Sequence, residues 1–328
     1  MSSPTLNIKA PSRLHFGLFG GNNPSGNSFG GLGVMVENPG IEVRIQPAPQ
    51  RTFTGNLADR LETFTDYWLQ FTGFHVQNEF HLDLVRAPQS HIGLGTGTQL
   101  GLCVGTLLFQ YHMGQTPSLD HTAESTGRGQ RSSVGSHGFL RGGLIVDRGK
   151  SKGQTLGELE LQLAYPENWR FVLIQPDGIP GISGSPENQY FSRKLAPLTQ
   201  QRNRLIQLTK ERIIPAILQE DFPEFSQSVF EFGKLSGSYF SNIQGGPFNG
   251  DRITEIIEAG RREGIAGIGQ SSWGPSIYVL AQSQHHAEQI QEIFAPMLNP
   301  SESLIISRPC NRGARLTDCH SFHRKFND

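Results

Sequence analysis

The chain has 328 residues, enough for one large domain or two smaller ones, each with a hydrophobic core. Its formal net charge is −1 and 17% of its residues are charged, so no basic excess favours nucleic acid or a membrane surface as a partner. Three cysteines form no disulfide framework, and neither a signal-peptide core nor a membrane-length apolar run occurs, so we expect a cytoplasmic protein of mixed α and β structure.

Strands and helices are predicted to alternate in the first half of the chain. The first strand is expected over residues 6–20, bent at Pro11, and glycine turns should follow it through residue 33. Further strands are predicted over 41–46, 80–88 and 141–149. Helices are predicted over 57–73, 100–109 and 118–126.

The second half is richer in helices. Its predicted strands are 159–166, 169–176, 276–282 and 303–309. Its predicted helical stretches are 198–243, with a break near Pro223, then 252–264 and 285–298. Because the composition changes near residue 165, we expect one domain over 1–165 and a second over 166–328.

The segment "HIGLGTGTQLGLCVG", residues 91–105, is a glycine-rich loop that runs into an apolar helix. Its residues of interest are Gly93, Gly95, Gly97, Thr96 and Thr98, and either threonine could cap the helix. Amide groups at such a helix start point at one spot and favour an anion such as phosphate or pyrophosphate. An ordinary glycine turn before a core helix fits equally well. The loop lacks the Gly-Lys-Ser/Thr ending of a Walker loop.

A second segment, "GRGQRSSVGSHGFLRGGLIVDRG", places arginines among small residues. The guanidinium groups of Arg128 and Arg131 suit phosphate or carboxylate, although a solvated basic loop would have the same composition. Asp147 ends the predicted strand here and could bind a metal or cap the next turn.

A third segment, "GIGQSSWGPS", surrounds an aromatic residue with glycines and hydroxyls just before a strand. Gln270, Ser271 and Ser272 are polar candidates, and Trp273 could stack on a planar ligand or anchor the core. Glu187 follows a glycine-rich loop and could serve as an acid, a metal ligand or a helix-start charge. The sequence identifies no metal ligands, because the cysteines and histidines near the C-terminus match no zinc spacing.

Taken together, "APSRLHFG", "GLGTGTQ" and "GIGQ" resemble the galactokinase–homoserine kinase–mevalonate kinase–phosphomevalonate kinase (GHMP) superfamily. The resemblance implies an α+β, two-domain GHMP-kinase-like fold. Its N-terminal domain would be ribosomal-protein-S5-like with a left-handed βαβ unit, and its C-terminal domain ferredoxin-like. The middle loop departs from the kinase pattern Gly-Leu-Gly-Ser-Ser-Ala-Ala after Thr96.

With that departure, and with "GQSSWGPS" further along, the chain resembles the β-ribofuranosylaminobenzene 5′-phosphate synthases, a non-kinase branch of the superfamily. That resemblance implies condensation of phosphoribosyl pyrophosphate with 4-aminobenzoate or 4-hydroxybenzoate, with release of CO2 and pyrophosphate, in tetrahydromethanopterin biosynthesis. It also implies Mg2+ together with pyrophosphate and no organic cofactor. It is compatible with a homodimer and gives no nucleic-acid or membrane partner.

The resemblance assigns roles to the residues singled out above. The expected catalytic residues are Arg128, Arg131, Asp147, Gln270 and Ser271. The expected substrate-binding residues are Arg13, His15, Gly93, Gly95, Thr96, Gly97, Thr98, Glu187, Ser272 and Trp273.

Two other functions stay open at this point. An ATP-dependent small-molecule kinase of the same superfamily would need the altered loop to accept ATP and a base such as Asp147 to take a hydroxyl proton. A regulatory module that senses a phosphorylated metabolite would bind without turnover.

Overall fold

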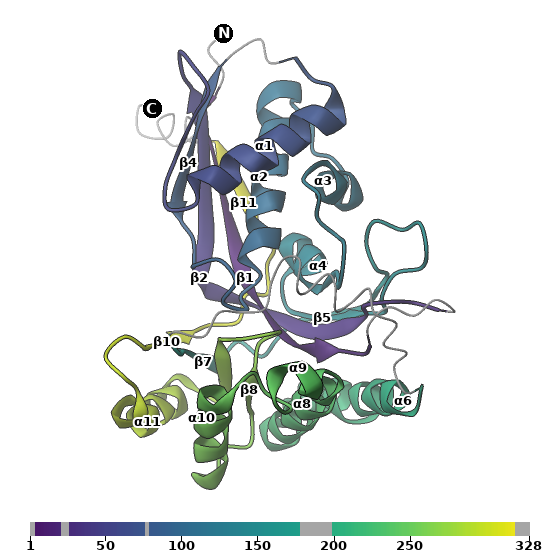
Figure 1. Cartoon of the computed structure of the whole chain (residues 1–328), viewed down its shortest axis with the longest axis vertical. Coiled ribbons are helices and arrows are strands. Elements are labelled where there is room, and N and C mark those ends of the chain that lie inside the picture. The colour runs from purple at the N-terminus through teal and green to yellow at the C-terminus, as the bar shows by residue number, and fades with distance from the viewer. Residues whose placement is uncertain (1–3, 21–25, 76–78, 178–198, 319–328) are drawn as a thin grey trace, which may run out of the picture.

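A computed structural model describes residues 4–20, 26–75, 79–177 and 199–318. Two antiparallel-rich sheets, one above the other in Figure 1, organise these residues, and helices cover them. No helix among these residues is both long enough and apolar enough to span a membrane.

The larger sheet has the strand order β11-β1-β2-β4-β3, and β5 joins it by pairing with both β2 and β6. Its strands are β1 (Leu6–Leu18), β2 (Gly31–Pro47), β3 (Thr52–Thr54), β4 (Phe80–Arg86), β5 (Leu144–Asp147), β6 (Leu159–Leu163) and β11 (Arg315–Asp318). The helices of this part are α1 (Ala58–Thr72), α2 (Thr96–Met113), α3 (Leu119–Ser125) and α4 (Val134–Arg141). β3 and β4 run parallel and are connected through α1, which makes a βαβ unit.

The smaller sheet has the order β10-β7-β9-β8, and its neighbouring strands are antiparallel. Its strands are β7 (Arg170–Gln175), β8 (Ile268–Gln270), β9 (Ile277–Ala281) and β10 (Ser303–Ser307). The helices of this part are α6 (Thr199–Leu208), a π-helical turn (Thr209–Ile213), α7 (Ile214–Leu218), α8 (Phe222–Gly237), a 3-10 turn (Ser238–Phe240), α9 (Ser241–Gln244), α10 (Asp251–Arg262), α11 (Gln284–Phe294) and a last 3-10 turn (Ala295–Met297).

The predicted bend of the first strand is present. The pairing of β1 with β2 shifts register between Ala10 and Ser12, on either side of Pro11. The glycine turns predicted through residue 33 are wrong from Gly31 onward, because β2 begins there. Gly33 lies so close to β1 that a Cβ would stand 2.4 Å from the carbonyl oxygen of Leu14. Glycine in this strand therefore allows close backbone approach rather than a turn.

Three buried clusters hold the fold together. One lies between the larger sheet and helices α1 and α2, and includes Phe64 and Trp68. Another lies between the smaller sheet and its helices α10 and α11. The third joins the two sheets, because Phe16 of β1 packs against Tyr278 of β9 with ring centroids 4.9 Å apart. This third cluster fixes the relative position of the two sheets, and the site described below lies beside it.

Several short elements were not predicted, namely β3, β8, β11 and α4. Each is eight residues or shorter, so contacts with residues distant in the sequence, rather than a local pattern, determine where it forms. The sheets divide between Leu163 and Arg170, but β11 returns to the larger sheet beside β1. The 165/166 domain boundary stays a prediction, and residues 315–318 pack with the first part of the chain.

Candidate active site

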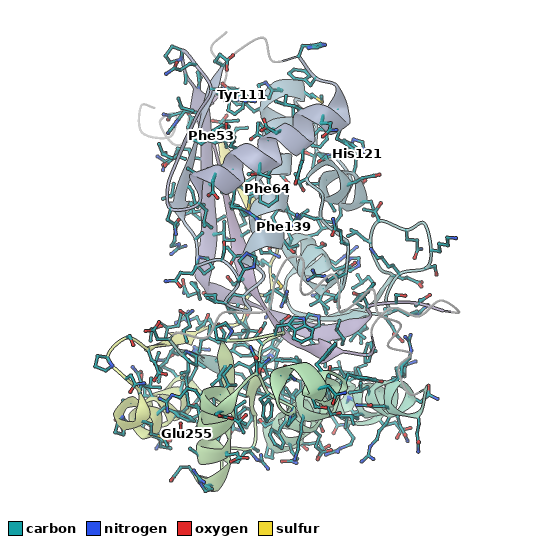
Figure 2. All side chains as sticks on the ribbon, viewed as in Figure 1. Phe53, Phe64, Tyr111, His121, Phe139 and Glu255 are labelled. Atoms are coloured by element: carbon teal, nitrogen blue, oxygen red, sulfur yellow. The ribbon has the colours of Figure 1, made fainter. Side chains whose placement is uncertain are left out.

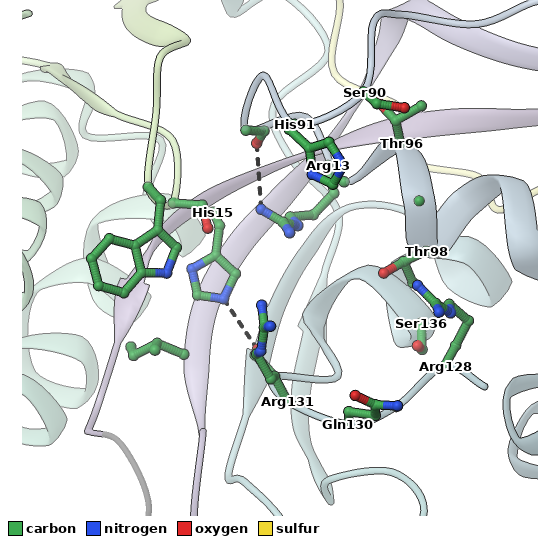
Figure 3. A pocket seen from close by; sticks show the side chains of 18 of the residues that line it. Arg13, His15, Ser90, His91, Thr96, Thr98, Arg128, Gln130, Arg131 and Ser136 are labelled. Atoms are coloured by element: carbon green, nitrogen blue, oxygen red, sulfur yellow. Dashed lines mark hydrogen bonds between the residues drawn. The ribbon is translucent and has the colours of Figure 1, made fainter. Parts of the chain in front are cut away.

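Four chain segments converge on one pocket of about 370 Å³. They are residues 13–18 of β1, the glycine loop that opens α2, residues 127–132 before α4, and the loop after β8 (Figure 3). Arg60 of α1 and Ser136 of α4 also line the pocket. A volume of this size is within the range of small-molecule sites. The pocket therefore brings together the three motifs that the sequence singled out.

The Ser271 hydroxyl ties three of these segments together. Its oxygen accepts a hydrogen bond from the backbone N–H of His15 at 3.0 Å, and it donates one to the Gly93 carbonyl at 2.7 Å. The backbone N–H of Ser272 donates to the His15 carbonyl at 3.0 Å. We call these three bonds the Ser271 clasp. The clasp holds β1, the glycine loop and the loop after β8 at fixed positions.

The glycine loop presents the start of α2 to the pocket. Gly95 occupies the N-cap position in a left-handed conformation, and no side chain caps the helix, so the capping predicted for Thr96 and Thr98 is wrong. Thr96 lies inside the first turn and donates its hydroxyl to the Gln89 carbonyl at 3.1 Å. Gly97 also lines the pocket. The first amides of an 18-residue helix thus face the pocket, which favours an anion.

Four arginines line the pocket around this helix start, namely Arg13, Arg60, Arg128 and Arg131. Figure 3 labels Arg13, Arg128 and Arg131. The guanidinium groups of Arg60 and Arg128 lie 5.1 Å and 5.0 Å from the ring centre of Phe64, which Figure 2 shows on α1. Such cation–π contacts hold the two groups in place. No aspartate or glutamate is among the described residues of the lining.

The positively charged guanidinium groups of Arg60 and Arg131 repel that of Arg128. Burial, with the neighbouring guanidinium groups of Arg60 and Arg131, lowers the pKa of Arg128 to about 10. A bound polyanion would relieve this repulsion, since an opposite charge stabilises the protonated form. The electrostatics therefore favour a ligand with several negative charges.

His15 is buried beside these charges and is held neutral. Burial, and secondarily the charge of Arg13, places the pKa of His15 well below its usual range. Its Nε2 lies 3.1 Å from the Ser132 hydroxyl, which in turn donates to Asp147 Oδ2 at 3.0 Å. Because Ser132 gives its proton to Asp147, it accepts from His15, which assigns the Nε2–H tautomer.

Asp147 stands behind this chain of hydrogen bonds. It is fully buried at the end of β5, and its oxygens accept hydrogen bonds from Ser132 and from the backbone N–H groups of Ser133 and Gly149. Burial raises its pKa, while these hydrogen bonds act in the opposite direction. Asp147 does not line the pocket, so it acts on the site only through Ser132.

A family model for the GHMP kinase C-terminal region matches residues 213–296. Across nearly its whole length, the chain is similar to the β-ribofuranosylphenol 5′-phosphate synthases of two archaea. The identity to the Methanothermobacter thermautotrophicus protein is 28%, covering 94% of this chain and 98% of that one. For the Archaeoglobus fulgidus protein it is 26%, covering 95% and 99%.

Solved structures agree on the fold. Homoserine kinase from Cytophaga hutchinsonii superposes with a TM-score of 0.67 at 17% identity, covering 95% of this chain and 97% of that chain. Mevalonate pyrophosphate decarboxylase from Streptococcus pyogenes gives 0.69 at 12%, covering 95% and 98%. The chain has a GHMP-kinase-like fold, and over nearly its whole length it is similar to the ribofuranosylphenol phosphate synthases. The recognition made from the motifs and the fold class are thereby confirmed.

Most of the predicted site residues lie in the pocket lining. They are Arg13, His15, Gly93, Gly95, Thr96, Gly97, Thr98, Arg128, Arg131, Ser272 and Trp273. Their individual roles stay predictions. Glu187 lies outside the described residues.

Three residues expected to be catalytic do not line the pocket, namely Asp147, Gln270 and Ser271. Gln270 accepts from the backbone N–H of Asn249 at 2.6 Å and donates to the Ser272 carbonyl at 2.9 Å. Ser271 is fully buried within the clasp. The polar groups of all three residues are engaged in hydrogen bonds that hold neighbouring segments in place, and their predicted catalytic roles stay predictions.

Sequence reasoning missed several lining residues, chiefly Arg60, Ser90, His91, Ser132 and Ser136. Arg60 is one polar residue on an amphipathic helix, and nothing in the neighbouring sequence indicates that it lines a pocket. One local signal is visible only in the backbone, because His91 and Ser272 both have positive φ without being glycine. Such strained residues concentrate at functional sites.

The pocket does not resemble a protein-built metal site. Among the described residues, no group of three or more histidine, cysteine, aspartate or glutamate side chains could hold a metal ion. Asp147, which is close behind Ser132, has its oxygens engaged in hydrogen bonds. The described residues therefore fit an anion and do not themselves fit a divalent cation.

Because of the clasp, we expect alanine at Gly93 to destabilise the fold more than alanine at Gly73. A Cβ at Gly93 would lie 2.5 Å from the Ser271 carbonyl oxygen, whereas nothing lies within 4 Å of one at Gly73. Both have positive φ, so Gly73→Ala should cost about 1 kcal/mol of unfolding free energy. Gly93→Ala should cost about 2–4 kcal/mol because of the added clash. Urea denaturation of both variants measures this, and equal losses would contradict the clasp.

The buried His15 predicts a pH dependence of stability. Below about pH 6.5, the unfolded chain binds a proton at His15 that the folded chain does not bind, so stability falls as the pH falls. The wild type should therefore lose up to about 1.4 kcal/mol per pH unit more than His15→Gln below that pH. Urea denaturation at pH 7.5, 6.5 and 5.5 gives the difference, and parallel pH profiles would show that His15 is protonated in the fold.

Proposed function

We propose that the chain condenses phosphoribosyl pyrophosphate with 4-hydroxybenzoate or 4-aminobenzoate. The products are a C-riboside 5′-phosphate, CO2 and pyrophosphate, in tetrahydromethanopterin biosynthesis. The curated relatives are named as synthases of a ribofuranosylphenol 5′-phosphate and match 88–95% of the chain. The observation that carries the proposal is the arginine-lined pocket at the start of α2.

The pocket matches the anionic substrate. Phosphoribosyl pyrophosphate carries a diphosphate and a monophosphate, and the pocket offers helix amides with four guanidinium groups. Arg128 would be stabilised by such a ligand, because burial and the neighbouring guanidinium groups disfavour its charged form and lower its pKa. We place the diphosphate against Gly95–Thr98 and the arginines, where it is gripped and then released.

The reaction needs stabilised charge and alignment rather than a strong base. The ring carbon that bears the carboxylate bonds to the anomeric carbon of ribose as the bond to pyrophosphate breaks. The carbon–carboxylate bond then breaks, CO2 leaves, and its electron pair restores the aromatic ring. Loss of CO2 replaces loss of a proton, so no general base is required. The placement of Asp147 behind Ser132, away from the lining, agrees with this chemistry.

The arginines and helix amides would stabilise the negative charge that develops on the leaving pyrophosphate. Since the described lining lacks carboxylates, we propose Mg2+ only as an ion that arrives bound to the diphosphate. A cytoplasmic location and a homodimer stay predictions.

The test of this proposal is release of CO2. Purified protein is incubated with phosphoribosyl pyrophosphate, Mg2+ and carboxyl-labelled 4-hydroxybenzoate or 4-aminobenzoate, and the released label is counted. Release should require both substrates, and ATP should not replace phosphoribosyl pyrophosphate. No release from either acid, together with a rise in Tm on adding ATP, would instead support a kinase.

Substitution of Arg128 should lower the activity without lowering the stability of the fold. Arg128→Gln should reduce kcat/KM for phosphoribosyl pyrophosphate about 100-fold, because the positive charge of Arg128 would no longer stabilise the leaving pyrophosphate. Stability should be unchanged or slightly higher, since repulsion among the arginines falls. Arg262→Gln, exposed on α10, is the matched control and should keep wild-type activity. Wild-type kcat/KM in Arg128→Gln would remove Arg128 from the site.

A further inference from the structure

A second, smaller cavity opens beside the pocket. Its walls are largely apolar and include Phe16, Phe240, Phe248 and Trp273, with Gln244 among the polar residues. We call it the inner cavity. His15, Leu18, Ser272 and Trp273 line both the pocket and the inner cavity, so the two adjoin.

The inner cavity differs from the pocket in chemistry. No arginine, lysine, aspartate or glutamate is among the described residues that line it. Trp273 is mostly buried and packs on Phe240 with ring centroids 4.4 Å apart. Aromatic walls of this kind suit a flat, apolar ring. A phosphate would lose its hydration there without a cation to compensate its charge.

One polar atom of this wall lacks a partner. Gln244 is 95% buried, and its Nε2 donates to the carbonyls of Gly237 at 3.0 Å and Pro247 at 3.1 Å. Both partners are acceptors, so the side-chain amide must have its nitrogen on that side. Its Oε1 is then a buried acceptor, and no hydrogen-bond partner for it exists among the described residues. A buried acceptor of this kind costs free energy unless something donates to it.

We infer that the ring of the aromatic acid lies where the pocket and the inner cavity adjoin, against Leu18 and Trp273. Its 4-hydroxyl or 4-amino group then enters the inner cavity, whose volume is about 40 Å³, and donates a hydrogen bond to Gln244 Oε1. This rests on the proposed function. The reacting ring carbon must face the ribose in the pocket, and the 4-substituent lies at the opposite end of the ring. That substituent therefore enters the inner cavity. Gln244 becomes the residue that selects a ring with a hydrogen-bond donor opposite its carboxylate.

Binding measurements test this without relying on turnover. Isothermal titration, with pyrophosphate and Mg2+ present, gives Kd for 4-hydroxybenzoate, 4-aminobenzoate and 4-fluorobenzoate. Fluorine is close to hydroxyl in size but donates no hydrogen bond. The wild type should bind both donor acids at least about tenfold more tightly than 4-fluorobenzoate, the equivalent of one hydrogen bond. Equal Kd values would overturn the assignment, whether or not any variant folds.

Gln244→Met provides the second arm. It removes the acceptor while keeping the length of the side chain, so the preference for donor acids should collapse to within about twofold. Gln291→Met, exposed on α11, is the matched control and should keep the wild-type preference. A preserved preference in a folded Gln244→Met would overturn the role of Gln244.

The two proposals fail in distinguishable ways. If the wild type binds donor acids selectively but releases no CO2 with phosphoribosyl pyrophosphate, the inner cavity stands and the reaction fails. If it releases CO2 but binds 4-fluorobenzoate as tightly as 4-hydroxybenzoate, the reaction stands and the cavity assignment fails.

Discussion

The hydroxyl of Ser271 connects parts of the chain that are far apart in sequence. This hydroxyl accepts from the backbone of residue 15 and donates to the backbone of residue 93, and Ser271 directly follows β8 of the other sheet. Because the group is buried, losing it would leave the His15 N–H without its acceptor and the Gly93 carbonyl with only the 3.4 Å hydrogen bond from Arg13. The direction of α2, the position of His15 and the placement of Trp273 all depend on this junction. The site is therefore a property of the joint between the sheets.

The joint divides the site into two chemically distinct halves. The larger sheet and its helices supply the helix start and the four arginines. The helices and loops of the smaller sheet supply much of the apolar wall of the inner cavity. The two proposed substrates differ in the same way, since one is a polyanion and the other has a flat ring. Bringing the halves into contact at residues 15 and 272 is what would place the reacting carbons together.

Local signals in the sequence identified the three loops, because glycine, serine and arginine clusters are visible without knowledge of the fold. Roles within the loops were less predictable. Ser271 and Gln270 look like exposed polar candidates, yet backbone groups brought in from elsewhere engage them. Arg60 and Gln244 lie in unremarkable helical sequence, and only tertiary packing brings them to the site. The glycines of β2 look like turns because close approach between strands leaves no local pattern.

His15 is neutral and adds no charge to the pocket. Its charged form would add a further cation next to Arg13, and burial prevents this. Asp147 holds the Ser132 hydroxyl, and this hydroxyl holds Nε2–H of the ring, so the Nδ1 atom keeps its lone pair. The positive charge of the pocket therefore comes from arginine side chains, which keep it at any physiological pH. A site that stabilises a leaving diphosphate without proton transfer needs this kind of charge, because its strength does not change as nearby groups titrate.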